Sequence, residues 1–251
     1  FAEAGYPLRY FRARVPIWGL PPERKRQLIA VGGNLMSFDL PLKLWREKEL
    51  ALIHTHALGR IGAIGRAVAR SRKLPLVVTI HGGVLDVPDS MKRDFQTPVS
   101  HGWEWGKIFG WLLRSRRLLA DADAILTCNP REAELLRASY PDRRIQVQPH
   151  GVSLSLFQKD CREAARQAFP QLRDRRILLA VGRLDPVKNQ GWLLDHLPML
   201  LRRHSKIVLV LAGACTDMAY GGKLVCQVQK LGLEQQILLT GGLSPGDPRL
   251  L

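Results

Sequence analysis

Residues 181–189 read V-G-R-L-D-P-V-K-N and place two cations beside a glycine, at a predicted turn between a strand and a helix. An apolar run precedes this stretch, and leucines at helical spacing follow it. Gly182 can take backbone angles closed to other residues, and a helix N-terminus attracts anions. Arg183 would hold phosphate oxygens as a planar fork and Lys188 as a point charge. The stretch is therefore a candidate di-anion site, and the alternative is an ordinary surface turn with two cations.

A second candidate group begins with His81, which follows the apolar run 75–80. Gly82 and Gly83 come next, so an imidazole and flexible backbone amides are expected together at the end of a strand. Open α/β sheets bind their ligands at the carboxyl edge of the strands. This placement favours a role for His81 in a site over a purely structural one.

Three further histidines are weaker candidates. His54 and His56 lie at the end of another predicted strand and, being two residues apart, would point to one face. The sequence offers no third ligand beside them, so a metal site is not expected. His150 and Gly151 repeat the histidine-glycine pair at a polar break in the chain.

Seven short apolar runs predict buried strands, and helical patterns separate most of them. The strands are expected at 51–53, 75–80, 124–127, 145–147, 177–181, 207–211 and 236–239. The helical patterns cover 34–49, 60–72, 103–120, 131–139, 190–203 and 223–231. This alternation is typical of a mostly parallel, doubly wound α/β sheet. The polar, turn-rich stretch 149–158 places a domain boundary near residue 157.

Two segments allow more than one interpretation. One predicted helix has a smooth face, formed by Gly59, Gly62 and Gly65. These glycines do not form the phosphate-binding motif G-x-G-x-x-G, so close packing of the helix on the sheet is favoured over contact with phosphate. The segment 103–119 combines three tryptophans with four cations and is able to lie in a membrane interface. The alternative, which we favour from the sequence, is an amphipathic helix that packs on the sheet.

The composition indicates a globular protein with an anionic partner. The chain has 251 residues, 46% of them hydrophobic, and its 38 Lys and Arg against 22 Asp and Glu give a net charge of +16. Such a charge suits nucleic acid, an acidic membrane surface or a phosphorylated small molecule. No apolar run approaches the roughly 20 residues that span a bilayer, and no zinc-finger or RNA-binding motif occurs. The four cysteines are widely spaced, and we expect them to be reduced and mostly buried.

The two ends of the chain also suggest an expectation. It begins at Phe1 without an initiator methionine and ends at Leu251, just after a turn-like stretch rich in proline and glycine. We therefore expect an internal fragment of a longer protein.

Taken in succession, several segments resemble the family 4 retaining glycosyltransferases of the GT-B fold. They are L-I-H-T-H-A-L-G (52–59), P-L-V-V-T-I-H-G-G (75–83), A-D-A-I-L-T-C-N-P-R-E-A-E-L-L (122–136), I-Q-V-Q-P-H-G-V-S-L-S-L-F (145–157), V-G-R-L-D-P-V-K-N (181–189) and L-V-L-A-G (209–213). The resemblance implies an α/β, GT-B-like fold of two Rossmann-like domains with mostly parallel sheets, both incomplete. The acceptor-side domain would cover 1–157 and the nucleotide-sugar donor domain 158–251.

The resemblance also implies roles for individual residues. Arg183 and Lys188 match the basic pair that grips the donor diphosphate, and His81 matches a histidine near the transferred sugar, here the candidate catalytic residue. The other implied donor-binding residues are Gly182, Asn189 and Gly213. The implied cleft-lining residues are His56, Gly82, Gly83, His150 and Gly151. No metal and no cofactor is implied beyond the substrate, a nucleoside-diphosphate sugar that is UDP- or GDP-linked.

The departures from the family pattern concern the donor and acceptor pockets. The family's two glutamates separated by seven residues have no counterpart, and neither does its glycine-rich acceptor loop. His150 stands where the family commonly has Asn, and Cys128 where it commonly has Ser. We therefore expect this chain alone to bind donor poorly and to turn over little or nothing.

The sequence thus predicts a hexosyltransferase that extends a glycan or lipid-linked acceptor in cell-surface polysaccharide synthesis. It is expected to be cytoplasmic, with a possible peripheral contact to the acidic inner face of the membrane. One alternative is a non-catalytic basic module that binds nucleic acid, although no nucleic-acid partner is expected. Another is a relative of the same fold that acts as an epimerase or phosphorylase, since fold does not fix function.

Overall fold

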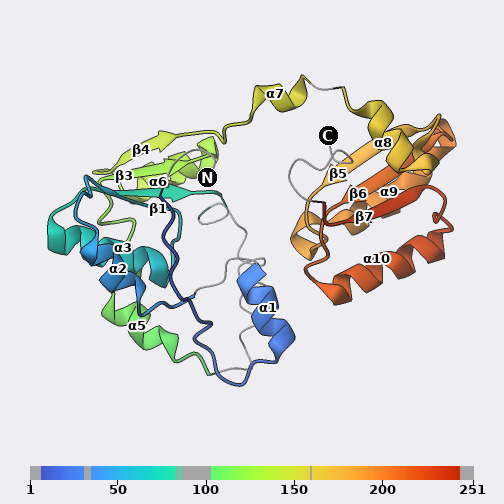
Figure 1. Ribbon diagram of the computed structural model, residues 1–251. Helices are drawn as coiled ribbons and strands as arrows, with labels where there is room; N and C mark the ends of the chain where they lie inside the picture. The colour runs from blue at the N-terminus through green and yellow to red at the C-terminus, as the bar shows by residue number, and fades with distance from the viewer. Residues whose placement is uncertain (1–6, 31–34, 83–84, 86–102, 159, 244–251) are drawn as a thin grey trace. The chain divides into compact units, whose positions relative to one another are not determined.

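The computed structural model describes residues 7–30, 35–82, 85, 103–158 and 160–243 (Figure 1). The chain divides into two compact units, Phe1–Gly151 and Val152–Leu251. Each unit has its own parallel sheet and its own helices, and each is described here by itself. Within the described residues, no helix is both long and apolar enough to cross a membrane.

The first unit is built on a four-stranded parallel sheet. Its strands β1 (Ile53–Thr55), β2 (Leu76–Ile80), β3 (Ala124–Thr127) and β4 (Arg144–Val147) pair in the order β1-β2-β3-β4. In the register of the sheet, Thr55 pairs with Val78, Val78 with Ile125, and Ile125 with Ile145. Helix α3 (Arg60–Arg72) connects β1 to β2, and α6 (Pro130–Ser139) connects β3 to β4. The parallel order brings the carboxyl ends of all four strands to one edge.

The remaining helices in the described part of this unit are short. They are α1 (Pro22–Ala30), α2 (Leu40–Arg46), α5 (Gly106–Leu112) and the 3-10 helix η3 (Ser115–Arg117). Figure 1 shows α2, α3 and α5 beneath the sheet. Apolar side chains of β1, β2, β3, α3 and α6, such as Val78, Ile125 and Leu136, form the core.

Helix α3 packs closely because it carries glycine where a larger residue would collide. A Cβ on Gly62 would lie 1.8 Å from the carbonyl oxygen of Ala57, and one on Gly65 would lie 3.4 Å from the side chain of Ile53 in β1. The expected packing of helix on sheet is therefore found at Gly65, which faces Ile53 of β1, whereas Gly62 packs against the backbone of the loop that follows β1.

Two ion pairs join α3 to the segment that contains α5. Arg60 Nη1 lies 2.8 Å from Glu104 Oε1. Arg66 Nε donates to Asp121 Oδ2 at 2.6 Å, and Arg66 Nη1 donates to the carbonyl oxygen of Leu113 at 3.3 Å. Although burial raises the pKa of Asp121, hydrogen bonds and charges from Arg66 and Arg117 hold it below its usual value. These contacts fix how α5 lies on the unit.

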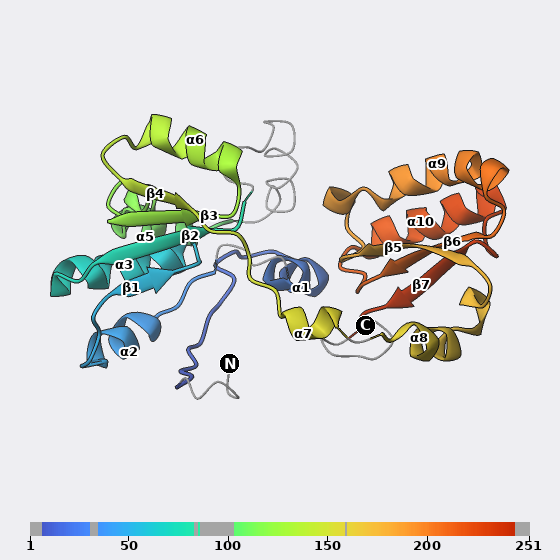
Figure 2. The ribbon, with the colours of Figure 1, turned by 90° about the horizontal axis from the view of Figure 1, so that it is seen from above.

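The second unit contains a three-stranded parallel sheet of β5 (Arg176–Val181), β6 (Ile207–Ala212) and β7 (Ile237–Gly241), in the order β5-β6-β7. Its helices are α7 (Leu154–Phe157), α8 (Arg162–Ala168), η4 (Pro170–Leu172), η5 (Pro186–Lys188), α9 (Gln190–Arg203) and α10 (Met218–Leu231). Figure 2 shows α9 and α10 on one side of the sheet and α8 on the other. Central strand β6 is buried at every position.

The two faces of β6 belong to separate apolar clusters. Ile207, Leu209 and Leu211 pack with leucines of α9 and α10. Val208 and Val210 pack with Leu172 on the opposite face. An apolar residue at every position of the strand is what burial on both faces requires.

The predicted α/β class is confirmed, and six of the seven predicted strands are found close to their expected bounds, whereas the first, expected at 51–53, lies at Ile53–Thr55. Two expectations about burial are wrong. Strands β4, β5 and β7 were expected to be buried, yet every residue of β4 and β7 is half-buried or exposed and β5 is exposed except at Ala180. Among the described residues each of the three lies at the edge of its sheet and pairs with one strand alone. The four cysteines are free as expected, but Cys128 and Cys161 are only half-buried and Cys215 and Cys226 are exposed.

The preferred interpretation of segment 103–120 is also wrong. Its helix ends at Leu112, because Arg114 adopts a left-handed backbone with φ of 49°. The helix that remains, α5, buries only Gly106, and its main contacts are with α3 and η3. The segment is therefore not a helix packed on the sheet.

Candidate functional site

The carboxyl edge of the second sheet is lined by glycine. Gly182 follows β5, Gly213 follows β6 and Gly241 ends β7. The amide of Gly182 donates to Ala212 O at 2.9 Å, and the amide of Gly213 donates to Gly241 O at 3.0 Å. A Cβ on Gly213 would lie 2.0 Å from the carbonyl oxygen of Gly182, so a larger residue does not fit there. A smooth rim of backbone thus forms at the edge where parallel sheets bind ligands.

Two cations stand beside this rim. Arg183 is half-buried, and its buried Nη1 has no hydrogen-bond partner in the part of the chain that the structure describes. The aliphatic part of Lys188 lies 4.0 Å from where a Cβ on Gly182 would stand. Among the described residues, neither cation forms an ion pair with a carboxylate. A buried donor without an acceptor is costly, so the geometry suits an incoming anion.

Two buried polar side chains that the sequence reasoning did not single out hold this turn in place. Asp185 Oδ1 accepts from the amide of Val187 at 3.0 Å, and its Oδ2 accepts from Thr216 Oγ1 at 3.3 Å. Gln190 Nε2 donates to the carbonyl oxygen of Arg183 at 2.8 Å. The signal for Asp185 is the Asp-Pro pair after a strand, which is typical of a side-chain-capped turn. No comparable local signal marks Gln190.

Asn189 contributes through its backbone. It adopts a left-handed φ of 51°, which asparagine tolerates better than most residues, and α9 begins directly after it. The amide of Gly191, the second residue of α9, donates to Tyr220 Oη at 3.1 Å and so joins α9 to α10. A donor-binding role for Asn189 stays a prediction.

In the first unit, the ends of three different segments bring histidine rings together. The rings of His56 and His81 are 5.0 Å apart and nearly parallel, and Nδ1 of His56 lies 2.8 Å from Nε2 of His81. The ring of His150 also stacks on His81, with the ring centroids 5.2 Å apart. His54 lies 4.5 Å from His56, which confirms that the two share a face. The stack stands at the carboxyl edge of this unit's sheet.

The histidine stack favours neutral rings. Burial and the neighbouring His54 lower the pKa of His56 below its ordinary value of 6.5. Burial and the rings of His56 and His150 lower the pKa of His81 in the same way. Since one nitrogen of the His56–His81 pair must accept the hydrogen bond, the two facing nitrogens do not both carry a proton. Neutral imidazoles at such an edge are able to donate to and accept from hydroxyl groups.

The glycines predicted near this edge have different surroundings. Gly82 has a left-handed φ of 91°, and a Cβ on it would lie 4.0 Å from Cys128 Sγ. Gly151 is exposed and has open space around its Cα. Gly83 lies outside the described residues. Among the residues that the structure describes, no three histidines, cysteines or carboxylates are arranged to hold a metal ion.

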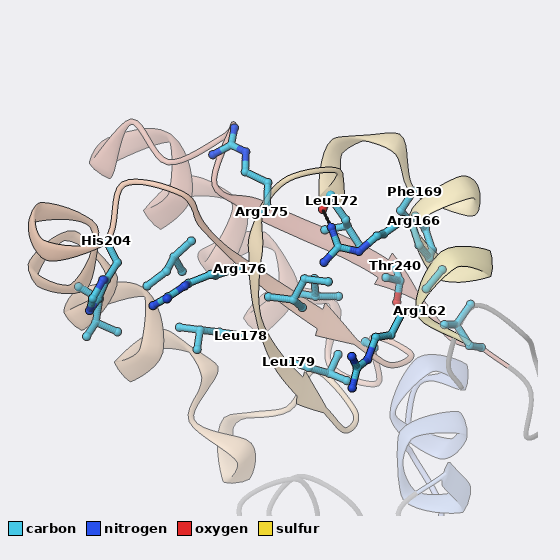
Figure 3. Close-up of a pocket in the computed structure, with 17 residues that line it drawn as sticks. Arg162, Arg166, Phe169, Leu172, Arg175, Arg176, Leu178, Leu179, His204 and Thr240 are labelled. Carbon is cyan, nitrogen blue, oxygen red and sulfur yellow. Dashed lines mark hydrogen bonds between the residues drawn. The ribbon is translucent and has the colours of Figure 1, made fainter. Parts of the chain in front are cut away.

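A hollow of about 810 Å³ lies along β5 (Figure 3), and neither Arg183 nor Lys188 lines it. Its floor is apolar and includes Leu178 and Leu179 of β5 and Leu172 of η4. Arginines of α8 and of the start of β5 surround it, as Figure 3 shows. The hollow therefore follows from the exposed flank of β5 and is separate from the glycine rim.

Comparison with protein families identifies both units. Residues 4–156 match the model of Glycosyltransferase Family 4. The chain belongs to glycosyltransferase family 4. Residues 162–251 match a second model, Glycosyl transferases group 1. The two matches cover the histidine stack and the glycine rim respectively.

Two curated relatives of this family 4 chain are informative. It is 24% identical over 224 residues to the alpha-monoglucosyldiacylglycerol synthase of Streptococcus pneumoniae, a match that covers 85% of the chain and 47% of that protein. It is 30% identical over 156 residues to D-inositol 3-phosphate glycosyltransferase 1 of Catenulispora acidiphila, covering 60% and 34%. The chain thus spans less than half the length of these two relatives.

Solved structures show the same fold. HepE of Anabaena in complex with UDP-glucose has a TM-score of 0.63 and 19% identity, covering 84% of this chain and 53% of that one. A glycosyltransferase of Rickettsia africae has a TM-score of 0.59 and 16% identity, covering 84% and 52%. The predicted GT-B-type fold, built from Rossmann-like units with parallel sheets, is confirmed.

Proposed function

We propose that this chain forms part of a retaining glycosyltransferase that moves a hexose from a nucleoside-diphosphate sugar, UDP- or GDP-linked, to a glycan or lipid-linked acceptor. The observation that supports this most directly is the buried Nη1 of Arg183, which has no partner beside the glycine rim. Family membership agrees with it. HepE, a protein of the same fold, forms a complex with UDP-glucose, which favours UDP as the nucleotide.

In this proposal the second unit binds the donor. The diphosphate lies on the backbone of Gly182 and Gly213, where the absence of side chains lets its oxygens approach the amides. Arg183 and Lys188 offset the negative charge that grows on the leaving nucleoside diphosphate as the sugar bond breaks. Stabilising such developing charge is commonly the largest contribution to catalysis.

The histidine rings of the first unit are neutral hydrogen-bonding groups suited to sugar hydroxyls. His81 is the proposed contact to the transferred hexose, and the stacked rings of His56 and His150 hold it in orientation. Because their neighbours lower the pKa values of His56 and His81, these rings stay neutral at neutral pH and do not repel the cationic charge that develops on the sugar.

The acceptor and the location are also proposals. The name of the Streptococcus pneumoniae relative refers to a glucosyl diacylglycerol, which favours a lipid-linked acceptor. We propose a role in cell-surface polysaccharide or glycolipid synthesis, with the protein peripheral on the inner face of the membrane. The net charge of +16 suits such an acidic surface.

The test is a titration of the chain with UDP and GDP at high nucleotide concentrations, because the chain alone is expected to bind donor weakly, and binding is followed by NMR, which detects weak complexes. Arg183→Ala should weaken binding of the diphosphate about tenfold or more, since a hydrogen bond to a charged group contributes about 1.5–3 kcal/mol. Lys188→Ala should weaken it less, because Lys188 is exposed. Arg203→Ala, at the opposite end of α9, is the matched control and should leave affinity unchanged. Unchanged affinity in both Arg183→Ala and Lys188→Ala would remove the assignment.

A further inference from the structure

We propose that the first unit binds the surface of an anionic lipid bilayer through an aromatic-basic face formed by α5, α2 and residues 8–11. The inference deepens the proposed function, because it names the surface that would bring a lipid-linked acceptor to the enzyme. Its evidence is independent of the donor site, since all of these residues belong to the first unit and the glycine rim to the second.

Helix α5 and its first flanking residue carry two sets of apolar side chains on neighbouring sides of the helix. Trp105 and Phe109 face the protein and pack with Phe38, whose ring stacks on Trp105 at 6.2 Å and meets Phe109 edge-on at 5.4 Å. A second set, Ile108, Trp111 and Leu112, falls at i, i+3 and i+4 and so shares one helix face. These three side chains are exposed by 63%, 80% and 66%. A helix with both faces apolar and one of them exposed has an unpartnered surface.

Helix α2 extends this surface. Leu42 and Trp45 are exposed on it, and they line a shallow apolar groove of about 260 Å³ together with α3 residues such as Ile64. Leu113, the residue after α5, lines the same groove. The groove therefore connects the exposed residues of α2 to Leu113, the residue that follows the exposed Leu112.

The N-terminal segment adds aromatic residues beside α2. The amide of Arg12 donates to the carboxylate of Asp39, and Lys43 Nζ donates to Tyr10 O, so residues 10–12 lie along the start of α2. Tyr10 is 81% exposed, and Leu8 is exposed as well. Three stretches that are distant in the sequence thus place exposed apolar side chains on the same unit.

Cations accompany these apolar side chains. Lys107, Arg114 and Arg116 are exposed around α5, and Arg46 is exposed at the end of α2. Among the described residues, none of these four forms an ion pair. The nearby carboxylates are already engaged, Glu104 by Arg60 and the buried Asp121 by Arg66. The face is therefore both apolar and positively charged.

This combination matches a bilayer better than a protein or a nucleic acid. Tryptophan and tyrosine prefer the boundary between lipid tails and headgroups, and free cations attract anionic headgroups. A nucleic acid would use the cations but would leave Ile108, Leu112 and Leu42 against water. Since no described helix spans a membrane, the contact would be peripheral, with the apolar side chains at the level of the headgroups.

The experiment measures binding of the full chain to phosphatidylcholine vesicles with and without phosphatidylglycerol, by co-sedimentation. We expect binding only to the vesicles that contain phosphatidylglycerol. The double variant Trp111→Ser/Leu112→Ser should weaken it about tenfold or more, because two exposed apolar groups no longer enter the interface. Trp192→Ser changes a tryptophan on α9 of the second unit that is 53% exposed; it is the control and should bind like the parent. Circular dichroism checks that each variant is folded.

A second pair of variants tests the charge. Lys107→Glu/Arg114→Glu should remove selectivity for phosphatidylglycerol, whereas Arg202→Glu/Arg203→Glu at the end of α9 should keep it. Unchanged vesicle binding in Trp111→Ser/Leu112→Ser would overturn the proposal. So would a concentration-dependent dimer that this variant abolishes while the parent ignores vesicles, because the face would then bind a second copy of the chain.

The outcome is separable from that of the donor site. Titration with UDP should give the same affinity for Trp111→Ser/Leu112→Ser as for the parent, while Arg183→Ala should bind vesicles normally. Loss of vesicle binding with UDP affinity retained supports the membrane face, whatever the second unit proves to bind.

Discussion

In each unit the parallel strands end at one edge of the sheet, but the residues at that edge differ in their chemistry between the two units. In the first unit, His81 follows β2 and contacts the rings of His56 and His150, and desolvation and these neighbouring rings lower its pKa. In the second, Gly182 follows β5 and Arg183 stands beside it with a buried, unpartnered nitrogen. The first edge is suited to neutral hydroxyl groups and the second to an anion. One architecture therefore presents two sites through only a few residues at the strand ends.

The largest effect is expected from a variant that prevents the backbone of Gly213 from lying close to that of Gly182 in the second unit. Gly213→Ala would place a Cβ 2.0 Å from the carbonyl oxygen of Gly182, so the turn must shift. We expect a loss of about 3 kcal/mol or more in the free energy of unfolding, and loss of UDP binding. Urea denaturation and a UDP titration measure the two effects.

Gly222→Ala is the control for that variant. Gly222 lies in α10 of the same unit, and a Cβ on it would meet nothing within 4 Å. Since alanine is favoured over glycine in a helix by about 0.8–1 kcal/mol, this variant should be as stable as the parent or more so. Equal stability of Gly213→Ala and the parent would show that the rim is not constrained as described.

A smaller effect is expected when the support of Arg183 is removed. Asp185→Ala deletes the acceptor for the amide of Val187 and for Thr216 Oγ1, and should cost about 1–2 kcal/mol of stability. UDP affinity should fall several-fold, because the turn that holds Arg183 loosens. Asp217→Ala removes a similar cap, that of α10, and should cost similar stability without loss of UDP affinity. Equal UDP affinities in the two variants would contradict a positioning role for Asp185.

The smallest effect concerns pH and the first unit. His56 and His81 have folded-state pKa values below 6.5, so between those values and 6.5 the unfolded chain binds more protons. The free energy of unfolding should therefore be greatest above pH 6.5 and fall as the pH drops toward the folded-state values. His81→Gln should make this fall shallower, as followed by thermal unfolding across pH. An unchanged slope would show that the stack does not resist protonation.

Local patterns predicted the elements well. The run 124–127 became β3 with the same bounds, and the helical pattern 60–72 became α3. Both are predictable because strand and helix periods appear in a few consecutive residues. The turn 181–189 was singled out for the same reason, since Gly182, Arg183 and Lys188 are near neighbours in the chain.

Burial was less predictable, because it depends on which elements become neighbours. The apolar runs of β5 and β6 look alike in the sequence, yet β6 has a strand on each side and β5 pairs with β6 alone among the described strands. The segment around α5 looked like a helix that covers the sheet, but its outer face is exposed. An apolar side chain in the sequence shows that burial would be favourable and does not show what would cover it.

The sequence by itself determined the parallel α/β class, the order of the strands along the chain, the resemblance to family 4 and the residues of the cationic turn. Only the tertiary structure decided that His56, His81 and His150 stack, that Nη1 of Arg183 is buried without a partner, and that Trp111 is exposed. The physical reason is the range of the interactions involved. Backbone periodicity and turn geometry act between residues a few positions apart, whereas ring stacking, burial of a guanidinium and exposure of a helix face are set by segments distant in the sequence.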